Sequence, residues 1–316
     1  MSQHLLIIST FDDIHIEFVV KHLPKSVPYT VIDPFQSVGR SDVSYRFDER
    51  NLRVCYGDTQ LDDITSVWFR KPTQLDQITF DVPDAYLPYT QSALRRHLAP
   101  LYRHWRNALW VSPYESIVAA ESKPHQLEAA MCIGFTVPDT LITGDKKRAK
   151  RFVKKYGVCV VKSQSARFPA GKTMMTTVVF ADDVLSYEGL SVDPMIFQQL
   201  IEPAYELRIT VVGNTVFAAK VSSAGAGPFR DWRYGHVDGS FHAEATTISK
   251  NLREKCIRLT QKFGLNYSAI DLIVDKDGVV WFLEINPNGQ WAFIEESTGQ
   301  AIGKAMAELL SSPKES

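Results

Sequence analysis

The chain has 316 residues and a formal charge of −1, from 35 basic and 36 acidic side chains. Hydrophobic residues make up 45% and charged residues 22%, which is typical of a globular protein and excludes a disordered, collagenous or coiled-coil chain. The length predicts about two domains, the balanced charge gives no reason to expect nucleic acid, and no apolar run reaches the roughly 18–20 residues that cross a bilayer.

The first part of the chain, residues 1–112, has the pattern of an α/β domain. It begins with a short apolar run at 5–9 without the basic region or cleavage site of a signal peptide, so we predict a buried strand there. Asp12 and Asp13 can cap the helix that follows, and residues 43–58 alternate and contain a Gly-Asp turn, which favours a hairpin. The other expected elements are strands at 29–33, 67–70 and 109–111 and a helix at 85–105.

A second region begins near Pro113 and becomes rich in strands towards its end. Residues 123–133 predict a helix with Gly134 just past it, and the Gly213-Asn214 pair predicts a hairpin turn between two strands. Residues 222–243 have an irregular pattern, rich in Gly and Arg. The other expected elements are helices at 182–188, 248–263 and 298–310 and strands at 195–201, 206–212, 216–221, 267–274 and 279–285.

The four cysteines lie far apart and match no metal-ligand spacing. Scattered cysteines in a chain of this length indicate free thiols in a reducing compartment. Because no signal peptide or membrane-spanning run is present, the sequence predicts a cytoplasmic protein without a membrane partner. The cysteines are Cys55, Cys132, Cys159 and Cys256.

The C-terminal pair of strands carries the most informative polar residues. Side chains alternate along a strand, so Glu284 and Asn286 point to one face, and pairing across the intervening turn can place Asp271 beside them. Three oxygen ligands on one face suit Mg²⁺. The alternative is that the two acids lie on the solvated face of a hairpin, but the strands are apolar enough to be covered on both faces, where an unpaired carboxylate is costly.

Two lysines on different elements are candidate phosphate ligands. Lys123 begins a helix, and Lys162 ends the apolar run 158–161 at a strand end, where an ammonium can reach phosphate oxygens. The polar loop at 163–172 is of the kind that closes over a phosphate, although it is neither a Walker A loop nor a Rossmann fingerprint. Taken singly, each lysine is better explained as an ordinary surface residue.

A strand-to-strand hinge precedes a strand with an acid and a base on one face. Glu206 can accept hydrogen bonds from ribose hydroxyls, and we expect Arg208 and Lys220 to face the phosphates from neighbouring strands. The alternative is a cross-strand ion pair, which stabilises little when exposed. The hinge residues whose backbone groups can meet an adenine edge are Gln198, Gln199, Leu200 and Ile201.

Together these features resemble the ATP-grasp family over about residues 113–310. The resemblance implies an α/β fold with a pre-ATP-grasp domain at 1–112, a lid subdomain at 113–194 and a C-terminal subdomain with the metal site at 195–316. It implies ATP and one or two Mg²⁺ ions as cofactors. The implied nucleotide ligands are Lys123, Lys162, residues 198–201 and Glu206; the implied metal ligands are Asp271, Glu284 and Asn286; the implied catalytic residues are Arg208 and Lys220.

A more specific resemblance is to the microviridin-type peptide ligases, also called graspetide synthetases. It rests on the segments 68–72 (WFRKP), 206–213 (ELRITVVG) and 287–291 (PNGQW), the last followed by Ile294-Glu295-Glu296. Those enzymes join Asp or Glu side chains of a ribosomal precursor peptide to Ser, Thr or Lys, and the resemblance implies such a peptide as partner and a homodimer. Glu206 stands where that family commonly has Asp.

The resemblance implies a two-step ligase reaction. A carboxylate attacks the γ-phosphate of ATP to give an acyl phosphate and ADP, and a hydroxyl or amine then displaces phosphate. One alternative is a ligase for a free amino acid or small peptide, and another is a non-catalytic nucleotide-binding protein. The complete metal set argues against the last, because a degenerate relative would be expected to lose its metal acids.

Three further groups have no settled role in the sequence. The segment 230–233 (RDWR) can bind an acidic substrate side chain or form a solvated loop, and the Arg70-Lys71 pair has the same two interpretations. His104 and Trp105 fit a core or an interface better than a site.

Overall fold

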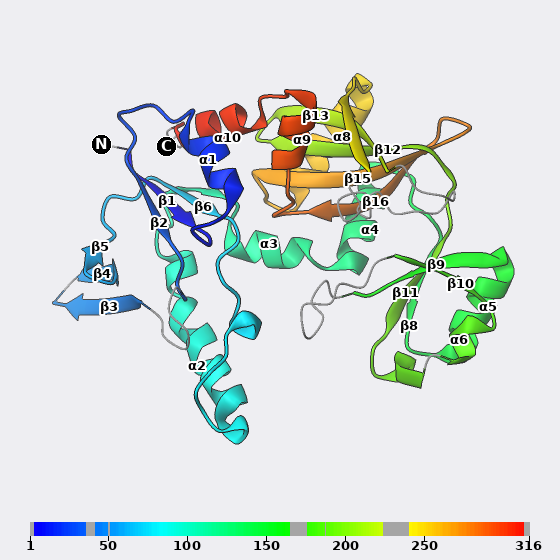
Figure 1. The fold of residues 1–316 in the computed structure, drawn as a ribbon, viewed down its shortest axis with the longest axis horizontal. Helices are drawn as coiled ribbons and strands as arrows, with labels where there is room; N and C mark the ends of the chain where they lie inside the picture. Colours follow the sequence, from blue (N-terminus) through cyan, green and yellow to red (C-terminus); the bar gives the residue numbers. More distant parts are fainter. Residues whose placement is uncertain are drawn as a thin grey trace.

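The computed structural model describes residues 3–35, 42–49, 51–164, 176–186, 188–223 and 240–312. Figure 1 shows an N-terminal α/β part, a strand-rich C-terminal part and a smaller lid that lies below the latter in this view. The mixed α/β architecture is the fold class that the sequence predicts. Within the described segments, every helix is too short or too polar to span a membrane.

The N-terminal part is built on a parallel sheet with the strand order β2-β1-β6-β7. All four residues of β1 are buried, as expected for a strand covered on both faces. Helix α1 (Ile14–Val20) begins where Asp13 accepts a hydrogen bond from the backbone N–H of His15, which confirms the predicted cap. The strands are β1 (Leu5–Ile8), β2 (Tyr29–Ile32), β6 (Ser66–Phe69) and β7 (Leu109–Val111).

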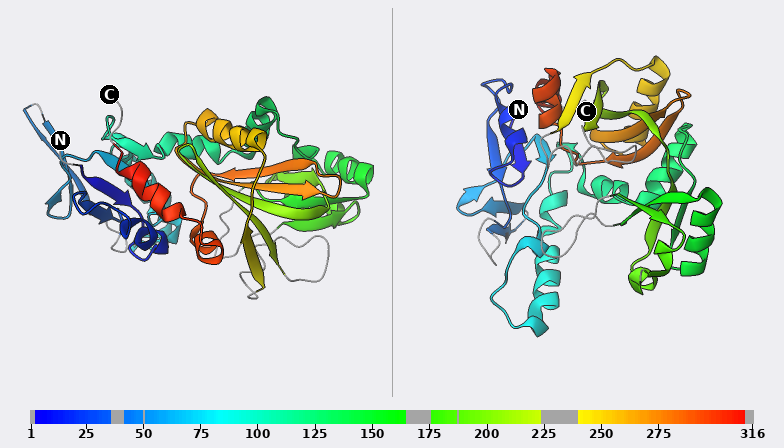
Figure 2. Two further views of the ribbon diagram at one scale, coloured as in Figure 1. Left: turned by 90° about the horizontal axis from the view of Figure 1, so that it is seen from above. Right: turned by 45° about the vertical axis from the view of Figure 1, so that its right-hand side comes forward.

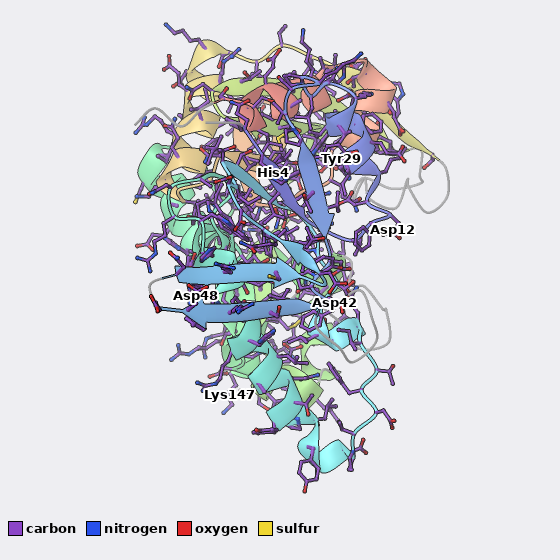
Figure 3. All side chains as sticks on the ribbon, turned by 90° about the vertical axis from the view of Figure 1, so that its left-hand side faces the viewer. His4, Asp12, Tyr29, Asp42, Asp48 and Lys147 are labelled. Atoms are coloured by element: carbon purple, nitrogen blue, oxygen red, sulfur yellow. The ribbon has the colours of Figure 1, made fainter. Side chains whose placement is uncertain are left out.

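A small antiparallel sheet and a long helix complete this part. Figure 3 shows the predicted hairpin below β2, with Asp42 and Asp48 at the two ends of its outer strand. The expected helix at 85–105 is shorter, because Pro100 follows Ala99 and has no backbone N–H to continue the helical hydrogen bonds. The elements are β3 (Val43–Asp48), β4 (Asn51–Tyr56), β5 (Thr59–Gln60), α2 (Leu87–Leu98) and the short 3₁₀ turns η1 (Leu75–Gln77), η2 (Asp84–Tyr86) and η3 (Leu101–Arg103).

The lid is an antiparallel sheet with the order β10-β9-β11-β8, covered on one face by helix α5 (Lys146–Tyr156). Ala149 and Val153 of α5 pack against Cys159, Val161 and Phe197 of the sheet. Helix α5 was not predicted from the sequence, because it has few apolar residues among many cations. The other lid elements are β8 (Thr140–Thr143), β9 (Val158–Lys162), β10 (Thr177–Phe180), β11 (Met195–Gln199), α6 (Asp183–Ser186) and the 3₁₀ turn η5 (Glu188–Ser191).

The C-terminal part is an antiparallel sheet with the order β14-β13-β12-β15-β16. The helix expected at 298–310 begins later, at Ile302, because Gly299 takes a left-handed conformation with φ of 67° and ends a separate helix that begins at Ala292 and that the sequence did not predict. The strands are β12 (Pro203–Val212), β13 (Thr215–Ser223), β14 (Phe241–Ala245), β15 (Tyr267–Asp275) and β16 (Val280–Asn286), and the helices are α3 (Tyr114–Ala120), α4 (Lys123–Ile133), α8 (Lys250–Lys262), α9 (Ala292–Thr298) and α10 (Ile302–Leu310).

Two boundaries differ from those expected at residues 113 and 195. Strand β11 belongs to the lid sheet, so the chain leaves the lid between Gln199 and Pro203. Helices α3 and α4 share one hydrophobic core with the C-terminal sheet instead of joining the lid.

Helix α10 packs against α1, as the left view of Figure 2 shows, so the C-terminal helix contacts the N-terminal part of the chain. The four cysteines are free thiols, as predicted.

Candidate nucleotide and metal site

Three charged side chains from three adjacent strands form a row across the C-terminal sheet. Arg208 of β12 lies opposite Asp271 of β15, and Asp271 lies opposite Glu284 of β16. Residues opposite each other in antiparallel strands share a face, so the register alone brings the three together. Nη1 of Arg208 donates to Oδ1 of Asp271 at 2.8 Å, and both side chains are buried.

Arg208 and Asp271 form a buried ion pair. Burial alone would lower the pKa of Arg208, but the Asp271 carboxylate outweighs it and raises that pKa above its usual value. Such a pair is stable only while both charges are present, because removing one leaves the other buried and uncompensated.

Glu284 of the C-terminal sheet contacts helix α4. Its Oε1 accepts from the amide of Asn286 at 3.0 Å, and its Oε2 lies 2.6 Å from Nζ of Lys123, the first residue of α4. Three predicted site residues are therefore in direct contact, although they come from two distant segments.

Gln126, which sequence reasoning missed, explains how Lys123 reaches the sheet. Strand β16 lies at the edge of the sheet, so the backbone groups on one side of Ile285 have no neighbouring strand of that sheet to pair with. Nε2 of Gln126 donates to the carbonyl of Ile285 at 2.9 Å, and Oε1 accepts from the N–H of Ile285 at 3.3 Å. The glutamine thus pairs with the edge like a strand residue and fixes the first turn of α4 beside Glu284. A glutamine three residues into a helix gives no sequence signal for this role.

The loop that follows Asn286 is held by buried polar groups through its carbonyl oxygens. The carbonyl of Asn288 accepts from Nη1 of Arg70 at 2.5 Å, that of Gly289 from the hydroxyl of Tyr267 at 2.7 Å, and that of Gln290 from Nη2 of Arg208 at 2.9 Å. Gly289 has no room for a side chain, because a Cβ would lie 2.4 Å from Cβ of Ala269 and 2.8 Å from Nη2 of Arg208.

Arg70 reaches this loop from the N-terminal sheet and forms a cluster with Asp13 and His15. Oδ1 of Asp13 lies 2.7 Å from Nδ1 of His15, and Oδ2 lies 3.3 Å from Nε of Arg70. Nε2 of His15 accepts from the backbone N–H groups of Trp291 and Ala292, so the ring is neutral with its proton on Nδ1. Arg70 is thereby assigned to holding the loop, which leaves Lys71 as the accessible member of the pair.

Lys71 is solvent-accessible and yet densely surrounded. Burial and the charge of Arg70 lower the pKa of its ammonium to about 8, and the charges of Asp13 and Arg208 also act on it. No hydrogen bond or ion pair joins its ammonium to another described residue. Asp13 balances Arg70 and Asp271 balances Arg208, so Lys71 supplies an excess positive charge next to the site.

The remaining predicted lysine lies in the lid. Nζ of Lys162 donates to Oε1 of Gln198 at 3.0 Å, and Nε2 of Gln198 donates to Oγ1 of Thr140 at 2.9 Å. The register of β9 and β11 puts Lys162 and Gln198 on one face, whereas α5 covers the other. The hinge lies where it was expected, because Gln199 ends a lid strand, and Leu200 and Ile201 lead into the C-terminal sheet.

Glu206 and Lys220 lie on opposite faces of the C-terminal sheet. Glu206 is two residues from Arg208 on β12 and shares its face. Lys220 lies opposite Leu207, so it shares the other face, where its Nζ is 4.8 Å from the ring of Tyr205 and 3.7 Å from Oε1 of Glu244. The expectation that Lys220 joins Arg208 is therefore wrong, because the alternation of side chains along β13 turns it away.

Two sequence candidates lie wholly or largely outside the described residues. They are the RDWR segment at 230–233 and most of the loop at 163–172. His104 directly follows the 3₁₀ turn η3, and its ring contacts that of Trp105.

The donor set at the row of charges fits a hard divalent cation. Asp271, Glu284 and Asn286 offer two carboxylates and an amide oxygen from adjacent register positions, which is the ligand type that Mg²⁺ prefers. No cluster of three His, Cys, Asp or Glu side chains occurs in the described part of the chain, so a metal here would take its remaining ligands from water and substrate.

Comparison with known proteins identifies one family over most of this site. Residues 120–310 match the model of the RimK-like ATP-grasp domain. A probable alpha-L-glutamate ligase of Vibrio atlanticus is 28% identical over 203 residues, and one of Vibrio vulnificus is 31% identical over 143 residues. These matches cover 62% and 44% of this chain and 65% and 46% of the relatives, so the chain spans less than two thirds of either.

Solved structures match the chain over nearly its whole length. A RiPP-associated ATP-grasp ligase of Chryseobacterium gregarium, in complex with ADP and a leader and core peptide, has a TM-score of 0.84 at 26% identity and covers 99% of this chain and 98% of its own. Macrocyclase MdnC of Microcystis aeruginosa, bound with precursor peptide MdnA, has a TM-score of 0.78 at 27% identity, with 98% and 99% covered. D-alanyl-alanine synthetase A of Vibrio cholerae, at 11% identity and a TM-score of 0.64 with 98% of each chain covered, shares the fold.

Proposed function

The chain belongs to the RimK-like ATP-grasp family, and on that premise we propose that it is an ATP-dependent ligase acting on a peptide. It activates an Asp or Glu side chain as an acyl phosphate and joins it to a hydroxyl or amino side chain as an ester or amide. The observation that carries this proposal is the row formed by Arg208, Asp271 and Glu284, with Lys123 at its end.

A peptide substrate is supported by likeness over the whole chain. The ligases of C. gregarium and M. aeruginosa hold peptides and match at least 98% of this chain, including its N-terminal part. D-alanyl-alanine synthetase A covers as much of the chain but at 11% identity and a TM-score of 0.64, so the support for a peptide substrate is the higher TM-scores and identities of the two peptide-bound enzymes over that length. The same resemblance leads us to propose a homodimer, which light scattering would test.

Adenine, ribose and phosphate each have a candidate partner in the site. Backbone groups of the hinge at 198–201 take the adenine edge, and Glu206 accepts from the ribose hydroxyls. Lys162 and Lys123 bind phosphate oxygens as point charges from the lid and from the start of α4. Both lysines now pair with acceptors, Gln198 and Glu284, that phosphate can replace.

Asp271, Glu284 and Asn286 are the residues that would hold Mg²⁺. Their oxygen donors fit that ion, and when bound it supplies positive charge and orientation for the phosphates. Arg208 holds Asp271 through an ion pair, and the amide of Asn286 donates to Glu284, so both carboxylates keep a partner when Lys123 turns to phosphate.

The chain's own part in the reaction is to position the reactants and neutralise their charge. The substrate carboxylate attacks the γ-phosphorus of ATP, ADP leaves, and the acyl carbon is then attacked by the nucleophile as phosphate leaves with the proton that the nucleophile loses. We assign the positioning of the carboxylate to Lys71, because its uncompensated charge lies next to Arg208. Lys123 and Lys162 hold the phosphates during the transfer.

A second candidate is a ligase for free glutamate. It is favoured by the curated relatives, which are named probable alpha-L-glutamate ligases. A third candidate is a non-catalytic nucleotide-binding protein, which has the same fold but does not turn over ATP.

One experiment separates these candidates. ATP turnover is measured with Mg²⁺ and a peptide rich in Glu, Asp, Thr and Ser, or with free glutamate plus an acceptor amine, and the peptide is weighed by mass spectrometry. The proposal expects stimulation by the peptide and the loss of one water mass per bond formed. Stimulation by free glutamate alone would favour the second candidate, and no turnover with either substrate would favour the third.

A further inference from the structure

The lid helix α5 carries a dense positive charge in a chain that is close to neutral. Seven of its eleven residues are Lys or Arg and none is acidic, whereas the whole chain has a formal charge of −1. The cations are Lys146, Lys147, Arg148, Lys150, Arg151, Lys154 and Lys155.

This charge pattern works against the stability of the helix. Like charges four residues apart each destabilise a helix by about 0.2–0.5 kcal/mol, and cations in the first turn oppose the helix dipole. Asp145, the N-cap, is the acid that compensates them there. Ala149 and Val153 account for the packing of the helix but not for its many exposed cations, and a local rule broken in this way is typical of a functional surface. The like-charge pairs are Lys146–Lys150, Lys147–Arg151, Lys150–Lys154 and Arg151–Lys155.

Part of the charge is balanced by acids on the protein and part is not. Lys150 pairs with Asp182 at 3.1 Å and Lys155 with Asp139 at 2.7 Å. By contrast, Lys147, Arg151 and Lys154 form no ion pair with any acid of the described chain. They are exposed and lie four and then three residues apart, so they form one stripe along the helix. We call these three residues the basic stripe.

The basic stripe faces away from the nucleotide site. Ala149 and Val153 pack onto the sheet face opposite to that of Lys162 and Gln198. Figure 1 shows α5 on the outer side of the lid, away from the C-terminal sheet. The stripe therefore does not serve the phosphates of ATP, and it is accessible to a large anionic partner.

We propose that the basic stripe of α5 is a docking surface for an acidic segment of the peptide substrate. This inference rests on the proposed function, in which the substrate carries several Asp or Glu side chains. Charge complementarity selects that occupant: the stripe offers three separate cations about one helical turn apart, which suits an extended chain with acids at intervals. Docking there raises the local concentration of substrate near the site and speeds association.

The test is a charge reversal that cannot act by unfolding the helix. The triple variant is Lys147→Glu/Arg151→Glu/Lys154→Glu. Its new carboxylates lie three or four residues from Arg148, Lys150 and Lys155, so α5 gains favourable ion pairs. The Tm of the protein is therefore kept or raised. The matched control, Lys25→Glu/Lys262→Glu/Lys276→Glu, changes the net charge equally at exposed lysines elsewhere. Binding of a fluorescent Glu-rich peptide and of its Gln counterpart is measured by anisotropy.

The stripe variant is expected to weaken binding of the Glu-rich peptide about tenfold at low salt, with little effect at about 0.5 M salt where charges are screened. Its KM for the peptide rises by the same factor while kcat at saturating peptide is kept, and the control variant and the Gln peptide show no such change. Equal affinities and salt dependence for the two triple variants would overturn the docking proposal. The docking proposal would also be overturned if RNA or anionic vesicles bound to the basic stripe and the Glu-rich peptide did not displace them.

Failure of the docking proposal is distinguishable from failure of the proposed function. If the wild-type protein forms product from the peptide and the stripe variant has an unchanged KM, the docking proposal alone is wrong. If the wild-type protein forms no product from any peptide, the proposed function is wrong and the docking proposal falls with it.

Discussion

Nζ of Lys123 lies 2.6 Å from Oε2 of Glu284, although 161 residues separate them in the chain. The contact depends on α4 meeting the edge of the C-terminal sheet, where Gln126 pairs with the backbone of Ile285. The proposed phosphate ligand Lys123 and the proposed metal ligand Glu284 are therefore positioned by the same contact between Gln126 and Ile285, and a change in that contact should affect both.

Replacing Gln126 with Leu should damage stability and nucleotide binding together. The variant leaves the backbone of Ile285 without its partner, which costs about 1–3 kcal/mol because a buried polar group is unsatisfied. Lys123 loses its fixed place, so ATP affinity falls as well. Urea unfolding and ATP titration check the two effects. The control Gln261→Leu removes an exposed glutamine and should leave both unchanged, and wild-type ATP affinity in Gln126→Leu would contradict the positioning role.

Replacing Asp271 with Asn should abolish ATP turnover and destabilise the fold by about 3–5 kcal/mol, because Arg208 becomes a buried charge without a partner. The double variant Arg208→Met/Asp271→Leu removes both charges and should recover most of the lost stability without recovering activity. Denaturant unfolding and ATP turnover separate the two consequences. A single variant as stable as the wild type would show that the pair is not buried as described.

His15 should make stability depend on pH in a narrow window. Burial lowers the pKa of His15 below the usual 6.5. Below pH 6.5 the His15 ring is therefore protonated in the unfolded chain while it is still neutral in the folded protein. Stability therefore falls as pH drops from 6.5 to about 5, with a slope of at most about 1.4 kcal/mol per pH unit.

The measurement for His15 is best made in a His104→Gln background, because burial also lowers the pKa of His104. Adding His15→Gln should remove the remaining slope in this window. Asp13 does not interfere: burial opposes its ionisation, but the hydrogen bond from His15 and the charge of Arg70 prevail and lower its pKa, so its contribution is lost at more acid pH. An unchanged slope would contradict the neutral form of His15.

Lys71 should impose an upper pH limit on activity with an acidic substrate. Its pKa of about 8 means that the ammonium loses its charge as pH rises through 8, and kcat/KM then falls. The variant Lys71→Arg stays charged and should move that fall to higher pH, whereas Lys71→Met should raise KM for the carboxylate substrate at every pH. The control Lys25→Arg should leave the profile unchanged. A Lys71→Arg profile that coincides with the wild type would remove Lys71 from substrate binding.

Much of this architecture is predictable because it depends on local patterns. Apolar runs gave the buried strands β1 and β15, Asp13 gave the cap of α1, and the alternation of Glu284 and Asn286 put both on one face. The resemblance to ATP-grasp enzymes and to peptide ligases is confirmed by the family match and by the solved structures.

The features that escaped prediction depend on register and on contacts across the chain. Lys220 was assigned to the wrong face although the predicted turn fixes the register: a two-residue turn at Gly213-Asn214 pairs Val212 with Thr215, and counting back from it places Lys220 opposite Leu207. The pairing of Gln126 with β16 and that of His15 with the start of α9 join segments that no local pattern relates. Helix α5 was missed because its charge pattern opposes helix stability.

The central claim, activation of a substrate carboxylate as an acyl phosphate, is tested most directly by oxygen transfer. The peptide is prepared with ¹⁸O in its Glu and Asp carboxylates and turned over with ATP and Mg²⁺, and the released phosphate is analysed by mass spectrometry. The account predicts ADP as the nucleotide product and one ¹⁸O atom in phosphate for each ester or amide formed. Product formed with unlabelled phosphate, or with AMP in place of ADP, would contradict it.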